Sequence, residues 1–205
     1  ERLIEAALAF DPPHLSCYHL TIEPNTLFHR YPPRLPDDDA TAAMQEAIES
    51  RLAEAGYDHY EISAYAKRDA GCRHNLNYWQ FGDYLGIGAG AHGKVSLPDR
   101  ILRQMRQKQP QRYMEAAEQG NAVQEQHDVA VRELPFEFMM NALRLTAGFP
   151  VRLFEERAGL PLTAVLDALE IAERRGFISR DHERVMPTSL GRRFLNDLLQ
   201  VFLAP

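Results

Sequence analysis

Two extended segments separated by one amphipathic helix constrain the fold of this chain most. Residues 14–22 and 57–65 are rich in β-branched and aromatic residues, and the first segment ends at the turn-forming step Glu23-Pro24. Between them, Asp37 can cap a helix whose apolar residues recur every three or four positions up to Gly56. A strand–helix–strand order is typical of parallel sheets, so the sequence predicts an α/β fold.

Functional side chains in such sheets gather at the carboxyl ends of the strands. This rule points to Thr21, Glu23, Ser63 and Tyr65 and to the loops that follow them. Glu23 precedes a proline, which also fits an ordinary turn. We therefore assign no catalytic residue from this pattern.

The last third of the sequence has a different pattern, and we expect a domain boundary near residue 128. One apolar face over 132–146 predicts a helix, as do 151–158 and 162–175; a short hairpin fits 177–179 with 184–186, and Thr188 can cap a last helix through Phe202. Helix, helix, hairpin, helix is the order of a winged-helix module. The expected domains are 1–128 and 129–205.

Charge and hydropathy exclude two classes of partner. The formal net charge of −6 and the acidic side chains Asp167, Glu170 and Glu173 on the would-be recognition helix argue against nucleic-acid binding. No apolar run reaches the length of about 18 residues that a membrane-spanning helix needs, and no secretory signal is present. We expect a cytoplasmic protein.

The segment Cys72–Gln80 holds the densest group of functional residue types and is predicted to be a loop. His74 could bind a metal or an iron porphyrin, Asn75 could orient it, and Tyr78 with Trp79 could offer a flat apolar surface. The alternative is structural: the aromatic rings anchor the loop, and His74 is simply hydrogen-bonded. The local residues leave both open.

A glycine-rich segment follows at residues 84–93. Its Gly88-x-Gly90-x-x-Gly93 spacing matches a dinucleotide fingerprint, but residues 94–98 are not a helix, so the phosphate-binding helix end is missing. The alternating Gly86, Gly88 and Gly90 suggest a strand approached closely, either by a ligand or by another part of the chain.

Cysteine content excludes a thiolate cluster within this sequence. The two cysteines, Cys17 and Cys72, are 55 positions apart and form no metal-binding spacing. The sequence starts inside an amphipathic helix, without Met or a capping residue, which suggests a chain cut from a longer one.

Taken together, four segments resemble the heme-handling branch of the radical S-adenosylmethionine (SAM) family, close to oxygen-independent coproporphyrinogen III oxidase. The resemblance covers nearly the whole chain and rests on Leu15–Thr26, Tyr60–Ala66, Cys72–Trp79 and Gly86–Gly93. It implies the C-terminal part of a partial (β/α) radical-SAM barrel followed by a mainly helical, winged-helix-like domain. It also implies a [4Fe–4S] cluster and SAM in the full-length protein; the cluster cysteines are expected upstream of Glu1, so this chain alone should be inactive in radical chemistry.

The resemblance assigns roles to seven residues. Thr21, Ala91 and His92 are expected to contact SAM, largely through the backbone. The signature His74-Asn75-x-x-Tyr78-Trp79 is expected to bind heme, with His74 as the candidate ligand of the heme iron.

The implied function is that of a heme chaperone, which binds heme and delivers it to apo-hemoproteins. The alternative is an enzyme, the oxygen-independent coproporphyrinogen III oxidase of porphyrin biosynthesis. A third hypothesis is a winged-helix interaction module without chemistry of its own. A homodimer is left open.

Overall fold

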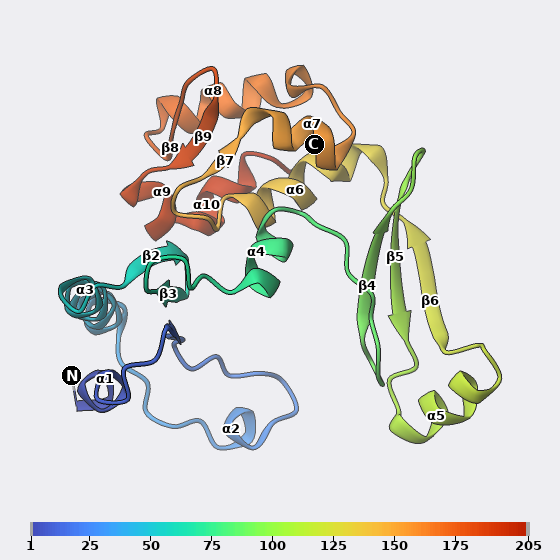
Figure 1. The fold of residues 1–205 in the computed structure, drawn as a ribbon, viewed down its shortest axis with the longest axis horizontal. Helices are drawn as coiled ribbons and strands as arrows, with labels where there is room; N and C mark the ends of the chain where they lie inside the picture. Colours follow the sequence, from blue (N-terminus) through green and yellow to red (C-terminus); the bar gives the residue numbers. More distant parts are fainter. Residues whose placement is uncertain (1, 204–205) are drawn as a thin grey trace. The chain divides into compact units, whose positions relative to one another are not determined.

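The computed structural model describes residues 2–203, and contacts between Cα atoms divide the chain into two compact units, 1–72 and 73–205 (Figure 1). The domain boundary predicted near residue 128 falls inside the second unit and stays a prediction.

The first unit contains three helices and three short strands in its described part. They are α1 (Arg2–Leu8), β1 (His14–Ser16), α2 (Leu27–Arg30), α3 (Asp38–Glu54), β2 (Asp58–Glu61) and β3 (Ala64–Ala66). Helix α3 begins as predicted, because Asp37 Oδ1 accepts a hydrogen bond from the Ala40 N–H at 2.8 Å. It ends before Gly56, whose φ of 82° suits a residue without Cβ.

The strands of the first unit pair differently from the prediction. The order is β1-β3-β2, and β3 runs antiparallel to both neighbours, so β1 and β2 are parallel without being adjacent. The strand predicted over 14–22 stops at Ser16, and Thr21 is exposed outside any strand. The strand predicted over 57–65 turns at Ile62 and Ser63 and becomes a hairpin. Strand-forming residue types mark a half-buried extended chain but do not say which segment pairs with it.

The second unit begins with a helix and an antiparallel sheet. Its first elements are α4 (Arg73–Trp79), β4 (His92–Ser96), β5 (Ile101–Arg106), α5 (Pro110–Glu118) and β6 (Val123–Asp128), with sheet order β4-β5-β6. The glycine-rich segment is not the predicted strand: apart from one bridge between Tyr84 and Lys94, pairing starts at His92. A Cβ on Gly86 would lie 2.4 Å from the His92 carbonyl oxygen, so this glycine permits close backbone packing within the chain.

The predicted helix, helix, hairpin, helix order of the last third is confirmed. The elements are η1 (Val131–Glu133), α6 (Leu134–Ala142), β7 (Phe149–Pro150), α7 (Val151–Ala158), η2 (Leu162–Val165), α8 (Leu166–Arg174), β8 (Ile178–Arg180), β9 (Arg184–Pro187), α9 (Ser189–Arg193) and α10 (Leu195–Gln200). The single last helix predicted through Phe202 is wrong in one respect, because it is interrupted at Phe194. The mixed α/β class is confirmed.

Phenylalanine rings dominate the core of the second unit. Phe138 is fully buried and makes edge-to-face contacts with Phe81, Phe149 and Phe154 at centroid distances of 5.8, 5.0 and 5.1 Å. Phe81 follows helix α4, so the segment after α4 is anchored directly in this core.

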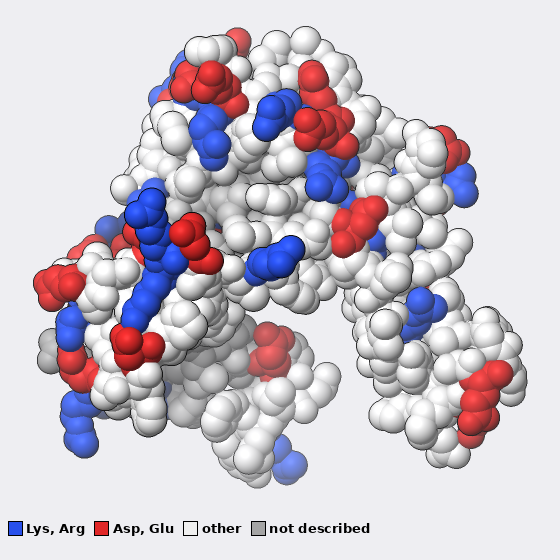
Figure 2. All heavy atoms as spheres, in the orientation of Figure 1, with Lys and Arg blue, Asp and Glu red and all other residues white. Residues whose placement is uncertain are grey.

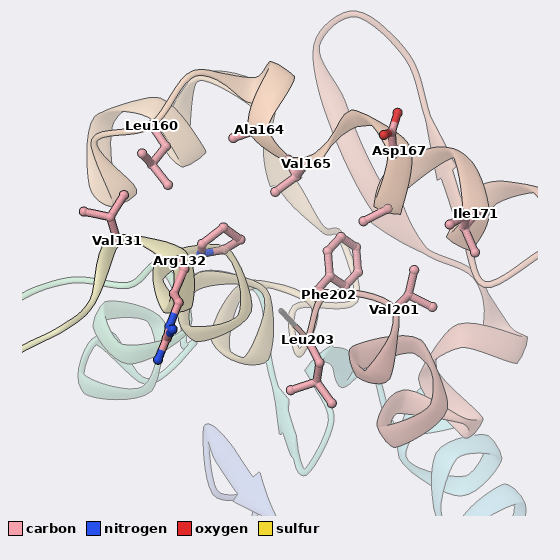
Figure 3. A pocket seen from close by; sticks show the side chains of 12 residues that line it. Val131, Arg132, Leu160, Ala164, Val165, Asp167, Ile171, Val201, Phe202 and Leu203 are labelled. Atoms are coloured by element: carbon pink, nitrogen blue, oxygen red, sulfur yellow. The ribbon is translucent and has the colours of Figure 1, made fainter. Parts of the chain in front are cut away.

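An apolar groove of about 540 Å³ crosses the C-terminal part of the second unit (Figure 3). It is lined by residues of η1, α6, η2 and α8, by Leu160 between α7 and η2, and by the residues after α10, including Phe202. The charged side chains along it are Arg132 and Asp167. Its lining contains no histidine and no pair of carboxylates, the residue types that acid–base catalysis commonly uses.

Charge is mixed on the visible face of the molecule. Figure 2 shows lysine and arginine side chains interspersed with aspartate and glutamate, without an extended patch of one sign. The ion pairs of the described residues include Arg51 with Glu5 and Arg180 with Glu173. Isolated surface pairs of this kind contribute little to stability.

Candidate functional site

The segment that carries the predicted heme residues is helical. The prediction of a loop over 72–80 is wrong, because residues 73–79 form α4 and the Gln80 N–H continues the helical pattern to the Leu76 carbonyl at 2.9 Å. On a helix, residues four positions apart lie on the same face. The spacing of the signature therefore separates its members into two pairs: His74 with Tyr78, and Asn75 with Trp79.

The first pair extends into a row of three rings. The His74 and Tyr78 rings are 4.8 Å apart, and the Tyr78 ring lies 4.3 Å from the ring of Tyr84, with interplanar angles of 37° and 36°. His74 is exposed, and Tyr78 is half-buried. We call His74, Tyr78 and Tyr84 the aromatic row. It presents an imidazole next to two phenol rings at the surface of the second unit.

Neighbouring groups fix the inner end of the row. The Tyr84 hydroxyl accepts a hydrogen bond from Arg103 Nη1 at 2.8 Å, and Arg103 also pairs with Glu137. Burial raises the pKa of the Tyr78 hydroxyl, and the nearby Tyr84 adds to this, whereas Arg103 opposes it. The Tyr78 hydroxyl therefore stays protonated near neutral pH.

Trp79 does not form one flat surface with Tyr78. The two ring centroids are 6.5 Å apart and the planes are inclined by 57°. The Arg144 guanidinium lies 4.3 Å from the Trp79 ring centroid, which is a cation–π contact. The indole Nε1 is buried and has no hydrogen-bond partner within residues 2–203. Asn75 is half-buried on the same side of the helix as Trp79.

Tyr84 is the member of the row that sequence reasoning missed. It lies six residues after Tyr78 and outside α4, so no helical spacing relates the two. Its ring is brought to Tyr78 by the backbone bridge with Lys94, in which each residue's N–H donates to the other's carbonyl at 3.0 and 2.9 Å. Nothing in the local sequence indicated this bridge.

A buried lysine lies directly behind the row. Lys94 is 1% exposed, and its ammonium donates to the Phe81 carbonyl, Asp83 Oδ1 and Ser96 Oγ at 3.0, 2.9 and 3.1 Å. Burial lowers the pKa of Lys94, and the Asp83 carboxylate partly offsets this. Burial also disfavours the charged form of Asp83, but hydrogen bonds from Ser96 and Lys94 outweigh that effect and lower the pKa of this carboxyl.

The predicted SAM contacts lie in different units. Thr21 belongs to the first unit, whereas Ala91 and His92 belong to the second, where His92 begins β4. The Ala91 N–H donates to the Gly88 carbonyl and its own carbonyl accepts from the Arg106 N–H, at 3.2 and 2.8 Å. A contact with SAM at Ala91 would therefore use the second lone pair of its carbonyl or its methyl group.

The described residues do not fit an iron–sulfur cluster. Across residues 2–203, no three His, Cys, Asp or Glu side chains lie close enough together to hold a metal ion. Cys17 and Cys72 are both free and half-buried. A [4Fe–4S] cluster needs several thiolates around one site, which Cys17 and Cys72 do not provide.

Within the described part of the chain, no helix combines the length and the apolar character required to cross a bilayer.

Comparison with known proteins gives consistent matches. The family model of the HemN C-terminal domain matches residues 129–194. Heme chaperone HemW of Escherichia coli is 46% identical to this chain, heme chaperone HemW of Haemophilus influenzae 44%, and heme chaperone HemW of Bacillus subtilis 32%. These alignments cover 98%, 98% and 99% of this chain but 52%, 51% and 54% of the relatives, so the chain spans about half of their length.

A solved structure shows the same fold. Coproporphyrinogen III oxidase (HemN) from Escherichia coli, a radical SAM enzyme, matches with a TM-score of 0.70 at 16% identity, over 97% of this chain and 50% of that one. The identity to the HemW relatives confirms the family resemblance seen in the sequence. The chain is a homologue of the HemW proteins over about half of their length, and residues 129–194 form a HemN C-terminal domain.

Proposed function

We propose that this chain is part of a cytoplasmic heme chaperone that holds heme against α4 and passes it to apo-hemoproteins. The observation that carries the proposal is the aromatic row, in which exposed His74 lies next to Tyr78, whose ring is in tilted contact with the ring of Tyr84. The relatives named heme chaperone HemW support the same assignment.

The chemistry of the row suits heme as cargo. A neutral imidazole nitrogen is a common axial ligand of heme iron, and His74 is exposed enough to reach one. Tyr78 and Tyr84 provide apolar ring surface next to it for contact with the macrocycle. We assign Asn75 and Trp79 to holding the helix rather than to contacting the ring, since Trp79 is packed against Arg144.

Hemin titration of the protein and its His74→Ala variant tests this proposal. We expect a hemin affinity at least about tenfold lower in the variant, since one lost ligand bond of 1.4 kcal/mol or more corresponds to that factor. The Soret band should also shift, because the axial ligand changes. His182→Ala is the matched control, since His182 is 89% exposed in the hairpin turn of the second unit.

Transfer provides the second half of the test. Heme-loaded protein is mixed with apomyoglobin as the acceptor, and the appearance of holomyoglobin is followed by absorbance. Unchanged affinity together with unchanged transfer in His74→Ala would remove His74 from the site. Equal losses in His74→Ala and His182→Ala would indicate unspecific binding by histidines and contradict the proposal.

The fold likeness to coproporphyrinogen III oxidase favours a second candidate, an oxidative decarboxylation of a porphyrinogen. A shared fold does not establish a shared reaction. The test is product analysis of the full-length protein with reconstituted cluster, SAM and coproporphyrinogen III. Formation of a vinyl-bearing product would support the oxidase, and its absence would reject it. For the full-length protein we also propose that SAM contacts Thr21, Ala91 and His92. A homodimer is a further proposal for that protein.

A further inference from the structure

Helix α4 ends in a backbone conformation that its sequence does not favour. Phe81 has φ of 55°, in the left-handed region, where a large aromatic residue is strained. The other non-glycine residues with positive φ in residues 2–203 are Asp11, Asn25 and Asp69, types that adopt this region more readily. Strain of this kind persists only where surrounding contacts impose it.

The strained residue completes the usual hydrogen bonds of a helix C-terminus. The Phe81 N–H donates to the Tyr78 carbonyl at 2.9 Å, and the Gly82 N–H donates to the Asn77 carbonyl at 2.7 Å. This is the pattern of a Schellman motif, in which glycine normally takes the left-handed position. Here phenylalanine takes it, and its ring packs in the core against Phe138. The chain therefore keeps a ring where backbone conformation alone would favour glycine.

Lys94 supplies the contacts that hold this end. Its ammonium uses all three of its donors, on Phe81, Asp83 and Ser96, and also lies 4.1 Å from the centroid of the Phe81 ring. Asp83 in turn accepts from the Ser96 N–H at 2.9 Å and from the Ser96 hydroxyl at 2.8 Å. These hydrogen bonds involve charged groups and occupy all three N–H donors of the Lys94 ammonium. They link the segment at the end of α4 to strand β4.

The same contacts determine where two rings of the aromatic row lie. Tyr78 is on the last turn of α4, and Tyr84 follows Asp83 and pairs with the backbone of Lys94. Asn77, beside Tyr78, donates from its amide to the Asp83 carbonyl at 2.9 Å. Moving Asp83 or Lys94 would therefore change the separation of the Tyr78 and Tyr84 rings.

We propose that Phe81, Asp83, Lys94 and Ser96 form a clamp that positions the Tyr78–Tyr84 pair for heme. The residues of the clamp are positioning residues, since they act through α4 and Tyr84 rather than on heme itself. The inference rests on the proposed heme function. It goes beyond that function by assigning part of the affinity to buried Lys94 and its ion pair with the exposed Asp83 carboxylate.

Trp79 allows the clamp to be tested without heme. The 205-residue chain contains one tryptophan, and it lies on α4, so fluorescence excited at wavelengths that tyrosine does not absorb reports on that helix. In Lys94→Met we expect acrylamide to quench Trp79 more strongly than in the wild type, with a shifted emission maximum. The hemin affinity should fall by up to about tenfold, which corresponds to the loss of one well-placed aromatic contact.

The matched control is Arg184→Met. Arg184 also donates from a long cationic side chain to backbone carbonyls of the second unit, those of Ala147 and Gly148 at 2.8 and 3.3 Å. It is expected to leave Trp79 quenching and hemin affinity at wild-type values. Equal changes in both variants would mean general loosening of the unit and would overturn the clamp.

Ser96→Ala keeps the test decisive if Lys94→Met fails to fold. It removes one acceptor of Lys94 and one donor to Asp83 while both charges remain. We expect the same direction of change in quenching and in affinity, by roughly twofold, as one lost hydrogen bond of about 0.5 kcal/mol predicts. Unchanged quenching in the folded variants overturns the clamp, whereas wild-type protein that fails to bind hemin overturns the proposed function.

Discussion

The two units differ most in how much apolar surface they bury. In the first unit, Leu52, Tyr57 and Tyr65 form the buried cluster, with a few partly buried neighbours. Leu3 and Phe10 of the same unit are 85% and 86% exposed. The second unit has a continuous core that runs from Phe81 through α6, α7 and α8 to Phe202.

This difference in buried apolar surface predicts a difference in stability between the two units. Burial of apolar surface is the main source of folding free energy, so the second unit should supply most of the stability of this chain. The aromatic row belongs to this second unit and is anchored in its core through Phe81. The first unit has few buried apolar contacts and should open more easily on its own.

The largest expected effect is in the core of the second unit. Phe138→Ala should lower the free energy of unfolding by about 3–5 kcal/mol, because a fully buried ring is replaced by a cavity. Urea unfolding followed by circular dichroism measures this loss. Phe10→Ala serves as the control and should change stability by less than about 0.5 kcal/mol, since Phe10 is exposed. A loss below about 1.5 kcal/mol for Phe138→Ala would contradict the assigned role of this core.

The next largest effect is expected from a substitution in the core of the first unit. Leu52 is fully buried, so Leu52→Ala should cost about 2–3 kcal/mol, the lower part of the usual range, because the small cluster can collapse into the space. Hydrogen exchange should show lost protection in α3 and β2, with protection in α6 unchanged. An equal loss of protection in α6 would show that the two units unfold together and would contradict their different stabilities.

Two helix caps give a smaller, matched pair. Asp37 caps α3 in the first unit, and Thr188 caps α9 in the second, where its hydroxyl accepts from the Gly191 N–H at 3.0 Å. Replacement of either by alanine should cost about 1 kcal/mol of helix stability. In hydrogen exchange, Asp37→Ala should affect α3 alone, and Thr188→Ala should lower the stability of the whole second unit. The opposite distribution would argue against separate units.

The smallest effect depends on pH. Burial, reinforced by the nearby Glu49 carboxylate, raises the pKa of Tyr65 well above its ordinary value of 10. A group whose pKa is raised in the folded state stabilises the fold fully at pH values below its unfolded-state pKa. This stabilisation is lost as the pH rises from the unfolded-state pKa towards the folded-state pKa. The free energy of unfolding of the first unit should therefore be lower by about 0.8 kcal/mol at about pH 10.5 than at neutral pH. Thermal unfolding against pH measures the slope, and Tyr65→Phe should flatten it; an unchanged slope would refute the assignment to Tyr65.

Local sequence patterns predicted the last third of the chain well. The apolar face over 132–146 is buried as expected, with Phe138, Met139 and Ala142 at 0% exposed, and the hairpin and the Thr188 cap are where the pattern placed them. These features depend on residues three or four positions apart or on one turn, so short-range physics suffices. The helix of residues 38–54 was predicted for the same reason.

Strand partners and the form of the candidate site were harder. The segment over 57–65 reads as one strand, yet it turns at Ile62 and pairs with itself and with β1. The signature at 74–79 reads as a loop because Asn and aromatic residues are poor helix formers, yet it is helical in the structure. Packing against the Phe81 and Phe138 core overrides the weak local preference.

Composition, spacing and family resemblance were enough to predict the class of the fold, the helical C-terminal module and the candidate residues His74, Asn75, Tyr78 and Trp79. Three features came from the folded chain alone: His74 and Tyr78 share one face, Tyr84 completes the aromatic row, and Lys94 is buried behind it. The physical reason is distance along the chain. Contacts between β4 and the segment that follows α4 join residues more than ten positions apart, and a buried charge becomes favourable only when all its partners converge in space.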